Sequence, residues 1–260
     1  MRALGAHVAW FLLWGRVMTD NKPLQINDWW QSPLGELVLA LEQEKIAGLT
    51  SPILGSFTIQ IGGGARLKPL SNRIENQSWL GAEGDITALP EALPFRSHSI
   101  DNLLLLHVLE YADDPHQVLR ETERVLAADG KVILCCFNPI SLWGLRRLFS
   151  WQDAAPWHGY FFTKTRLKDW LALLNFEVTE QHKILFRPPF KHPRWLEGSH
   201  FLERWGKRLW PWFGAVSVMV ATKRTIPLTP LRENKRQHRL FPSPGLVNKP
   251  ITRDNKHGSC

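Results

Sequence analysis

The chain has 260 residues, 44% of them apolar, which is enough to bury the core of one domain of ordinary size with extensions. Its net charge of +8 would suit a nucleic-acid binder, but +7 of it lies from Thr222 onward, where nine Lys and Arg face two Asp and Glu. The body of the protein is therefore nearly neutral. The three cysteines have no spacing typical of a zinc site or a disulfide framework, and a reduced cytosol fits them best.

Residues 1–17 predict either a short membrane-seeking leader or an extended start. Val8–Trp14 is an apolar run flanked by arginines, too short to span a bilayer and without a cleavage site after it. A start at Met18 would give an ordinary soluble beginning. Both alternatives stay open, and the domain itself is expected over 18–224.

Residues 225–260 form a basic tail, rich in Pro, Asn and Lys and poor in apolar periodicity. Such a segment cannot bury enough surface to offset its ordering entropy, so we expect disorder there. The tail would either keep the protein soluble or make nonspecific contact with RNA, DNA or anionic lipid. Apart from such contact, we expect no nucleic-acid partner.

The first predicted helix begins at Ser32 and Pro33, with the serine as N-cap and the proline at the first helical position. The apolar residues that follow share one helical face: Leu34, Leu37, Val38 and Leu41. Phe57–Ile61 then predicts an apolar strand that runs directly into a glycine triplet. Another short strand is expected at 85–89.

The segment between Leu93 and Pro139 predicts a strand, a helix and a second strand. Ile100–Leu106 is wholly apolar and stops at the polar His107. The helix is expected from Asp113 or Asp114 to Gly130, followed by a strand over Lys131–Cys136. Strands buried on both faces belong in a parallel sheet, with the helix as the crossover.

The later residues complete an alternating pattern. We expect a helix or lid at 141–151, a helix over Thr163–Leu174, and strands at Phe176–Val178 and Ala215–Ala221. The order predicts an α/β fold: a doubly wound, mostly parallel, Rossmann-like sheet with helices on both faces. One antiparallel strand is expected near an edge.

The segment from Ser99 to Leu134 resembles one known family closely. Ile100-Asp101, the turn from His107 to Tyr111, and the helix end from Arg124 to Gly130 match, residue by residue, the fourth-strand to fifth-strand unit of class I S-adenosylmethionine-dependent methyltransferases with a type 11 methyltransferase domain. The resemblance implies a methyltransferase with S-adenosyl-L-methionine as cofactor. In-line methyl transfer requires no nucleophile or metal constellation, and none is evident in the sequence.

The resemblance places the cofactor on Gly62, Gly63 and Gly64, at the start of an expected helix with free N–H groups. Two residues depart from the family pattern, since Gln60 stands where an acid is usual and Arg66 where a third glycine is usual. A flexible loop after a strand is the plainer interpretation of a glycine triplet.

The resemblance also places Asp85 and Ile86 beside the adenine of the cofactor. A turn or cap residue is the structural alternative for the aspartate. Dinucleotide folds carry a ribose-binding acid about 20 residues after the glycines, but the stretch that should hold it is truncated here. Glu75 is an acid upstream of Asp85, and we do not assign it to the site.

His107 is the single catalytic candidate, and the family places this position next to both cofactor and acceptor. An imidazole could act as a general base near neutral pH. A structural role, with the ring bonded to nearby groups, is the alternative. Glu110 would be a local partner or a solvated charge.

A Trp-rich insertion at about 140–213 holds eight of the 13 tryptophans, interleaved with Arg and Lys. Its helices would either lie in a membrane interface or cover a soluble cleft, where they could form a lid over a hydrophobic or aromatic small-molecule acceptor. The sequence predicts a cytoplasmic protein, peripheral to the inner face of a membrane if the first alternative holds. A catalytically inactive, methyltransferase-like ligand- or partner-binding protein is the alternative function, because of Gln60, Arg66 and the truncated stretch.

Overall fold

The structure is a computed structural model that describes residues 22–50, 53, 55–69, 74–81, 84–149, 156–189, 205, 206, 208, 210 and 212–224. The expected leader and the expected basic tail lie outside the described residues. The elements in chain order are α2 (Lys22–Trp30), α3 (Pro33–Ala47), β1 (Gly55–Gly62), β2 (Ile74–Leu80), β3 (Ile100–Leu106), α4 (Pro115–Val125), β4 (Leu126–Phe137), α5 (Leu142–Phe149), α6 (Lys164–Leu173), β5 (Phe176–Ile184) and β6 (Val216–Lys223).

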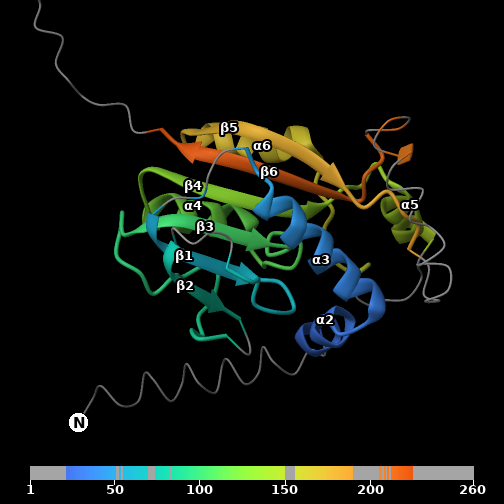
Figure 1. Cartoon of the computed structure of the whole chain (residues 1–260), viewed down its shortest axis with the longest axis horizontal. Helices are drawn as coiled ribbons and strands as arrows, with labels where there is room; N and C mark the ends of the chain where they lie inside the picture. The colour runs from blue at the N-terminus through green and yellow to red at the C-terminus, as the bar shows by residue number, and fades with distance from the viewer. Residues whose placement is uncertain are drawn as a thin grey trace, which may run out of the picture. The chain divides into compact units, whose positions relative to one another are not determined.

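The strands form one sheet with the order β2-β1-β3-β4-β6-β5 (Figure 1). The first four of these run parallel, and β6 lies antiparallel between β4 and β5. The predicted doubly wound, mostly parallel sheet is therefore confirmed. The expected antiparallel strand is β6, one place in from the edge.

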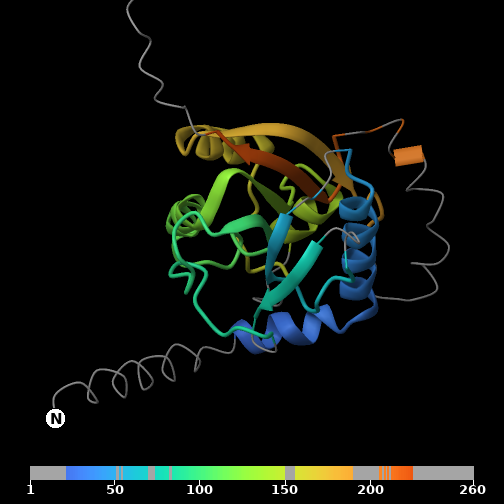
Figure 2. The same cartoon turned by 60° about the vertical axis from the view of Figure 1, so that its left-hand side comes forward.

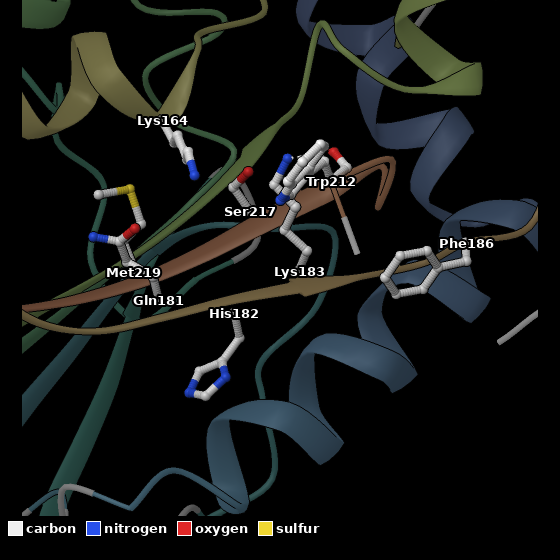
Figure 3. Close-up of a pocket in the computed structure, with 8 residues that line it drawn as sticks. All are labelled: Lys164, Gln181, His182, Lys183, Phe186, Trp212, Ser217 and Met219. Atoms are coloured by element: carbon white, nitrogen blue, oxygen red, sulfur yellow. Dashed lines mark hydrogen bonds between the residues drawn. The ribbon is translucent and has the colours of Figure 1, made fainter. Parts of the chain in front are cut away.

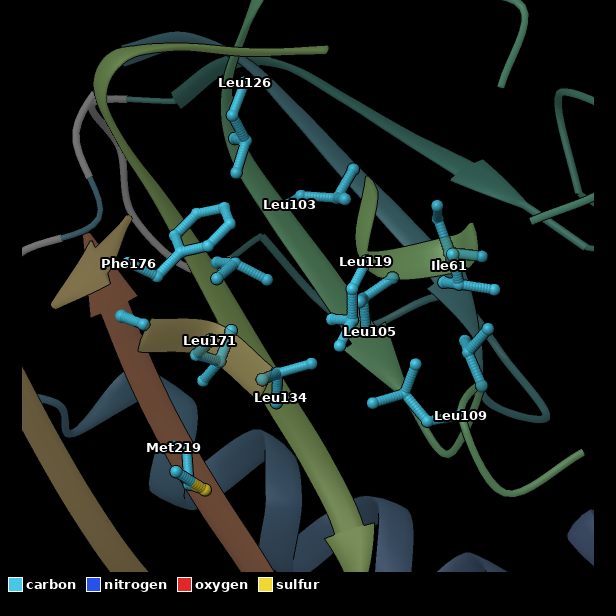
Figure 4. Close-up of a cluster of buried hydrophobic side chains, with 14 of the residues drawn as sticks. Ile61, Leu103, Leu105, Leu109, Leu119, Leu126, Leu134, Leu171, Phe176 and Met219 are labelled. Carbon is cyan, nitrogen blue, oxygen red and sulfur yellow. The ribbon is translucent and has the colours of Figure 1, made fainter. Parts of the chain in front are cut away.

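Two layers of helices cover the sheet, with α2 and α3 on one face and α4 and α6 on the other (Figure 2). Alternate residues of β3 point to opposite layers, which explains its unbroken apolar sequence. Leu103 and Leu105 pack with α4 and α6 (Figure 4), whereas Leu104 and Leu106 pack toward α3.

Local sequence fixes the helix starts. The Ser32 side chain accepts a hydrogen bond from the Gly35 N–H, and Asp114 accepts from the N–H groups of the first turn of α4. The far end of α4 differs from the prediction, because the helix stops at Val125 and β4 begins at once. The expected helix end at Gly130 is therefore wrong, and Asp129, with a φ of 58°, adopts a left-handed conformation within β4.

The region between β1 and β3 departs most from expectation. The helix expected after the glycine triplet is absent from 63–69, and β2 follows after a short connection. The strand expected at 85–89 is also wrong, since Ile86 makes only a single parallel bridge to Leu80. A chain without apolar periodicity between the glycines and β2 has no face to bury as a helix.

Candidate functional site

A cavity of about 270 Å³ lies at the carboxyl ends of β1, β2 and β3. Ligands of open α/β sheets bind at this edge. The residues around it come from α2, the strand ends and the loops after β2 and β3: Ile26, Asn27, Trp30, Ile61, Gly62, Gly63, Leu80, Gly81, Thr87, Ala88, Pro90, Leu106, His107, Val108, Tyr111 and Ala112.

The glycines of the triplet have separate roles. Gly62 and Gly63 line the cavity, and both have a φ of 74°, which side chains disfavour. A Cβ on Gly62 would lie 2.5 Å from the Leu106 carbonyl oxygen. Gly64 does not line the cavity, because its Cα faces Trp30, where a Cβ would lie 2.0 Å from the tryptophan Cβ. Gly64 thus lets Trp30 reach the cavity wall.

Gln60 holds the glycine loop in place. Its side-chain amide is fully buried, and Nε2 donates to the carbonyl oxygens of Gly62 (3.1 Å) and Ala65 (2.8 Å). Its Oε1 accepts from the Leu67 N–H at 2.8 Å. A carboxylate could not supply the two donated bonds. The glutamine therefore suits a glycine loop that is not followed by a helix.

Asp85 and Ile86 are not among the lining residues of the cavity. The Asp85 carboxylate accepts from the Trp79 N–H at 2.9 Å and forms an ion pair with Arg66. The carboxylate therefore closes the turn after β2. This is the turn role that we gave as the structural alternative to contact with the adenine. Ile86 packs against the core beneath.

No carboxylate stands among the described residues that line this cavity. At the end of β2, Leu80 and Gly81 occupy the rim. Glu75 belongs to β2, but its side chain lies outside what the structure describes. A cofactor with ribose hydroxyls would meet neutral polar groups here, such as those of Asn27 and Thr87.

His107 does line the cavity, and it is held by two buried carboxylates. Nε2 lies 2.7 Å from Oε1 of Glu42, and Nδ1 lies 2.9 Å from Oε1 of Glu110. The same Glu110 oxygen accepts from the Phe137 N–H, and the His107 ring lies 4.0 Å from the Phe137 ring. Both ring nitrogens are therefore engaged, which favours the structural role over that of a general base.

The charge of this Glu42–His107–Glu110 network follows from its geometry. Burial alone would lower the imidazole pKa, but the two carboxylates outweigh it and raise the pKa of His107 to about 10. A protonated imidazole donates to both carboxylates at neutral pH. Burial together with these carboxylates also raises the pKa of the Cys135 and Cys136 thiols, so neither is a reactive thiolate.

The Trp-rich segment is divided between core and surface. Trp143 of α5 is fully buried, and its indole N–H donates to the Arg187 carbonyl oxygen. Trp205, Trp210 and Trp212 are more than half exposed. The segment is therefore not one continuous amphipathic helix. Trp151 and Trp195, with all of 190–204, lie outside the described residues.

A set of exposed apolar side chains lies on and beside α5, and we call it the α5 patch: Ile140, Leu142, Leu145, Leu148, Trp212 and Phe213. The Asn138 side chain joins its two parts, because Nδ2 donates to the carbonyl oxygens of Ile140 and Trp212. Arg146 and Arg147 stand on the same helix. Within the described residues, no helix is long and apolar enough to cross a bilayer, and no group of side chains could hold a metal ion.

Three residues of the site escaped the sequence prediction. In the sequence, Glu42 looks like an ordinary solvent-facing acid of an amphipathic helix, but in the structure it is fully buried. Trp30 and Tyr111 line the cavity from the ends of a helix and a turn. Of the two carboxylates that hold His107, only Glu110 could be expected as a partner from the sequence, because it lies three residues after the histidine.

Comparison with known proteins identifies relatives of the whole chain. The profile of a methyltransferase domain matches residues 70–134. An uncharacterized Escherichia coli protein, YafS, is 34% identical over 241 residues, which cover 92% of this chain and 90% of that protein. An uncharacterized Mycobacterium tuberculosis protein, Rv2003c, is 27% identical over 186 residues, or 66% of this chain and 64% of that protein.

Solved structures share the fold. One is a Haloferax volcanii protein, described as a methyltransferase, in complex with the activator Trm112. It has a TM-score of 0.55 at 15% identity, and the match covers 77% of this chain and 97% of the Haloferax chain. An S-adenosylmethionine-dependent methyltransferase of Thermotoga maritima has a TM-score of 0.50 at 20% identity. The match covers 72% of this chain and 92% of the Thermotoga chain.

Proposed function

Because the chain belongs to the class I S-adenosylmethionine-dependent methyltransferase family, whose cofactor is S-adenosyl-L-methionine, we propose that it methylates a small hydrophobic or aromatic molecule. The observation that carries the proposal is the cavity at the carboxyl ends of β1 and β3, lined by Gly62, Gly63 and His107. Its volume of about 270 Å³ is close to the lower end of ligand sites, roughly 300 Å³.

The lining residues suit most parts of the cofactor. Leu80, Ala88 and Val108 offer an apolar wall for a purine, and the glycine backbone allows close approach to an amino-acid group. Trp30 and Tyr111 supply aromatic rings, which attract cations such as a sulfonium. When bound, the cofactor supplies a methyl group that is already activated. The protein then has to orient the acceptor and exclude water.

His107 acts in this proposal as a positioning residue. Its imidazolium is fixed by Glu42 and Glu110, so it holds the end of β3 rather than removing a proton from the acceptor. The network as a whole carries two carboxylates and one cation. This buried network lies beside the cavity that would receive the cofactor.

The α5 patch would face the acceptor side. A hydrophobic acceptor that partitions into a bilayer would be met most easily by a protein that rests on the membrane surface. Exposed Leu, Trp and Phe side chains with arginines on the same helix fit that contact. We therefore place the protein in the cytoplasm, peripheral to the inner face of the membrane.

Calorimetric titration with S-adenosylhomocysteine tests the cofactor site. We expect saturable binding by the full chain, accompanied by a change in tryptophan fluorescence because Trp30 lines the cavity. No heat at millimolar ligand would overturn the proposal. The second test is transfer of label from methyl-labelled S-adenosylmethionine to an organic extract of cells. Binding without transfer would favour the catalytically inactive alternative. The lack of a carboxylate among the described lining residues also supports that alternative.

A further inference from the structure

A second cavity, of about 290 Å³, lies at β5 and β6 and shares no lining residue with the first. Figure 3 shows the residues that surround it: Lys164, Gln181, His182, Lys183, Phe186, Trp212, Ser217 and Met219. The His182 ring points away from the others and pairs with Glu180. The methyl-transfer proposal makes no use of this cavity.

Strand register brings its polar groups together. Lys183 of β5 pairs with Ser217 of β6, and Gln181 pairs with Met219, so each pair projects from the same face of the sheet. That face is the one covered by α6, because Met219 belongs to the core cluster of that helix. Lys164 is the first residue of α6, whose N-terminus adds the positive end of the helix dipole.

The two lysines have no opposite charge paired with them in the described part of the chain. Among the residues that the structure describes, no carboxylate forms an ion pair with Lys164 or Lys183. The Lys183 ammonium donates to the Trp212 carbonyl oxygen and keeps further donors free. Partial burial, and then the neighbouring Lys164 cation, lower the pKa of Lys183. The cavity therefore holds positive charge that a bound anion would stabilise.

Ser217 provides the independent sign of a ligand. Ser217 is 3% exposed and lines the cavity, yet its Oγ has no hydrogen-bond partner among the residues that the structure describes. A buried hydroxyl without a partner costs roughly 1–3 kcal/mol, so such groups are rare unless a ligand or water completes them. The hydroxyl stands opposite Lys183, where both could bind one oxygen-rich group.

We propose that this cavity binds the phosphate of a small phosphate monoester through the Lys164 and Lys183 ammonium groups and the Ser217 hydroxyl. A monoester carries close to two negative charges at neutral pH, which matches two lysines, and its three oxygens can accept from all three donors. Trp212, Phe186 and Met219 leave an apolar wall for the organic part of the ligand. The assignment does not depend on methyl transfer.

Titration of the full chain with inorganic phosphate and with glycerol 3-phosphate tests the proposal, read by calorimetry and by the shift in melting temperature. Saturable binding is expected, weakened roughly tenfold by Lys183→Gln, since a charge-assisted hydrogen bond is lost. Ser217→Ala should weaken binding severalfold without lowering the melting temperature of the free protein. Unchanged affinity in both variants, or no binding by the unmodified chain, would overturn the site.

Lys45→Gln is the matched control, because it removes the same charge from α3 on the opposite face of the sheet. Equal weakening by this control would show nonspecific attraction and overturn the assignment. S-adenosylhomocysteine binding should be the same in Lys183→Gln and the unmodified chain, so that failure of this site and of the cofactor site are told apart. Vesicles of phosphatidylcholine with and without phosphatidic acid then separate a lipid phosphate from a soluble one. Lys183-dependent binding to phosphatidic acid alone would identify a lipid source, and competition by glycerol 3-phosphate would identify a soluble one.

Discussion

Glu42 and His107 are 65 residues apart in the chain, yet Oε1 of the glutamate lies 2.7 Å from Nε2 of the histidine in the core. The contact ties α3, which precedes the sheet, to the end of β3, where the cofactor cavity opens. Glu110 completes the arrangement on the other ring nitrogen. Stability and cavity shape thus depend on the same three side chains.

Replacing the imidazole should be severely destabilising. His107→Ala leaves two carboxylates buried without their cation, and breaking a buried ion pair costs roughly 3–5 kcal/mol. Urea unfolding measures the loss. Glu44→Gln, an exposed charge change on the same helix, should stay within about 0.5 kcal/mol. A loss below about 1 kcal/mol in His107→Ala would contradict the buried network.

Stability should fall as the pH rises above neutrality. The pKa of His107 is raised from 6.5 to about 10, so its stabilisation is complete below pH 6.5 and is lost as the pH approaches 10. The lowered pKa of Lys183 acts in the opposite direction, and the raised pKa values of the buried thiols add to the loss only above about pH 8.5. Urea midpoints from pH 7 to 8.5 should therefore decline, and the decline should be absent in His107→Gln.

Restoring the usual family residue at Gln60 should harm the protein. Gln60→Glu removes the donor to the Gly62 and Ala65 carbonyl oxygens and sets a buried carboxylate against them. A loss of about 1–3 kcal/mol in unfolding free energy is expected, with weaker rather than tighter S-adenosylhomocysteine binding. Tighter binding in Gln60→Glu would show that the loop can be rebuilt around an acid.

Gly62→Ala should abolish cofactor binding. Its Cβ would meet the Leu106 carbonyl oxygen at 2.5 Å and the Val108 side chain at 2.7 Å, and the φ of 74° adds strain of about 1–3 kcal/mol. Gly48→Ala is the control, because that glycine has a φ of −95° and its nearest neighbour is 3.4 Å away. Calorimetry with S-adenosylhomocysteine should separate the two variants by at least tenfold in affinity.

Membrane contact through the α5 patch should depend on its exposed leucines. The Leu145→Ser, Leu148→Ser double variant removes side chains that are 49% and 77% exposed, so the fold should tolerate it. Flotation with anionic vesicles should fall severalfold relative to the unmodified chain. Leu173→Ser on α6, at 80% exposure, is the control and should float normally. Equal flotation by all three proteins would contradict the patch as the contact surface.

The sequence predicted the sheet from β3 to β6 because burial there repeats in a simple pattern. The apolar run from Ile100 to Leu106 can be satisfied only between two helical layers, and Asp114 with Pro115 signals the crossover helix. The residues from 63 to 99 were harder to interpret. β2 has a polar sequence, IENQSWL, and it lies at the edge of the sheet, so no apolar run marks it.

The backbone features of the candidate site could be expected from the sequence. The contacts between side chains of distant elements could not. The resemblance placed Gly62 and Gly63 after β1, and the structure gives both a positive φ, which glycine adopts readily. The distant partner of His107 could not be predicted, because Glu42 comes from another element and its burial depends on how α3 packs. The resemblance alone placed Asp85 beside the adenine, and its contacts with the Trp79 N–H and Arg66 became visible only in the fold.

The position of β6 has a consequence for synthesis of the protein. β6 is the last strand that the structure describes, and it separates β4 from β5 in the sheet. Until Lys223 has left the ribosome, β4 presents an open, apolar edge and β5 has no neighbour to pair with. The nascent chain thus exposes aggregation-prone strands until β6 has been synthesised, and premature termination before Val216 would leave a product with two unpaired edges for chaperones and proteases to clear.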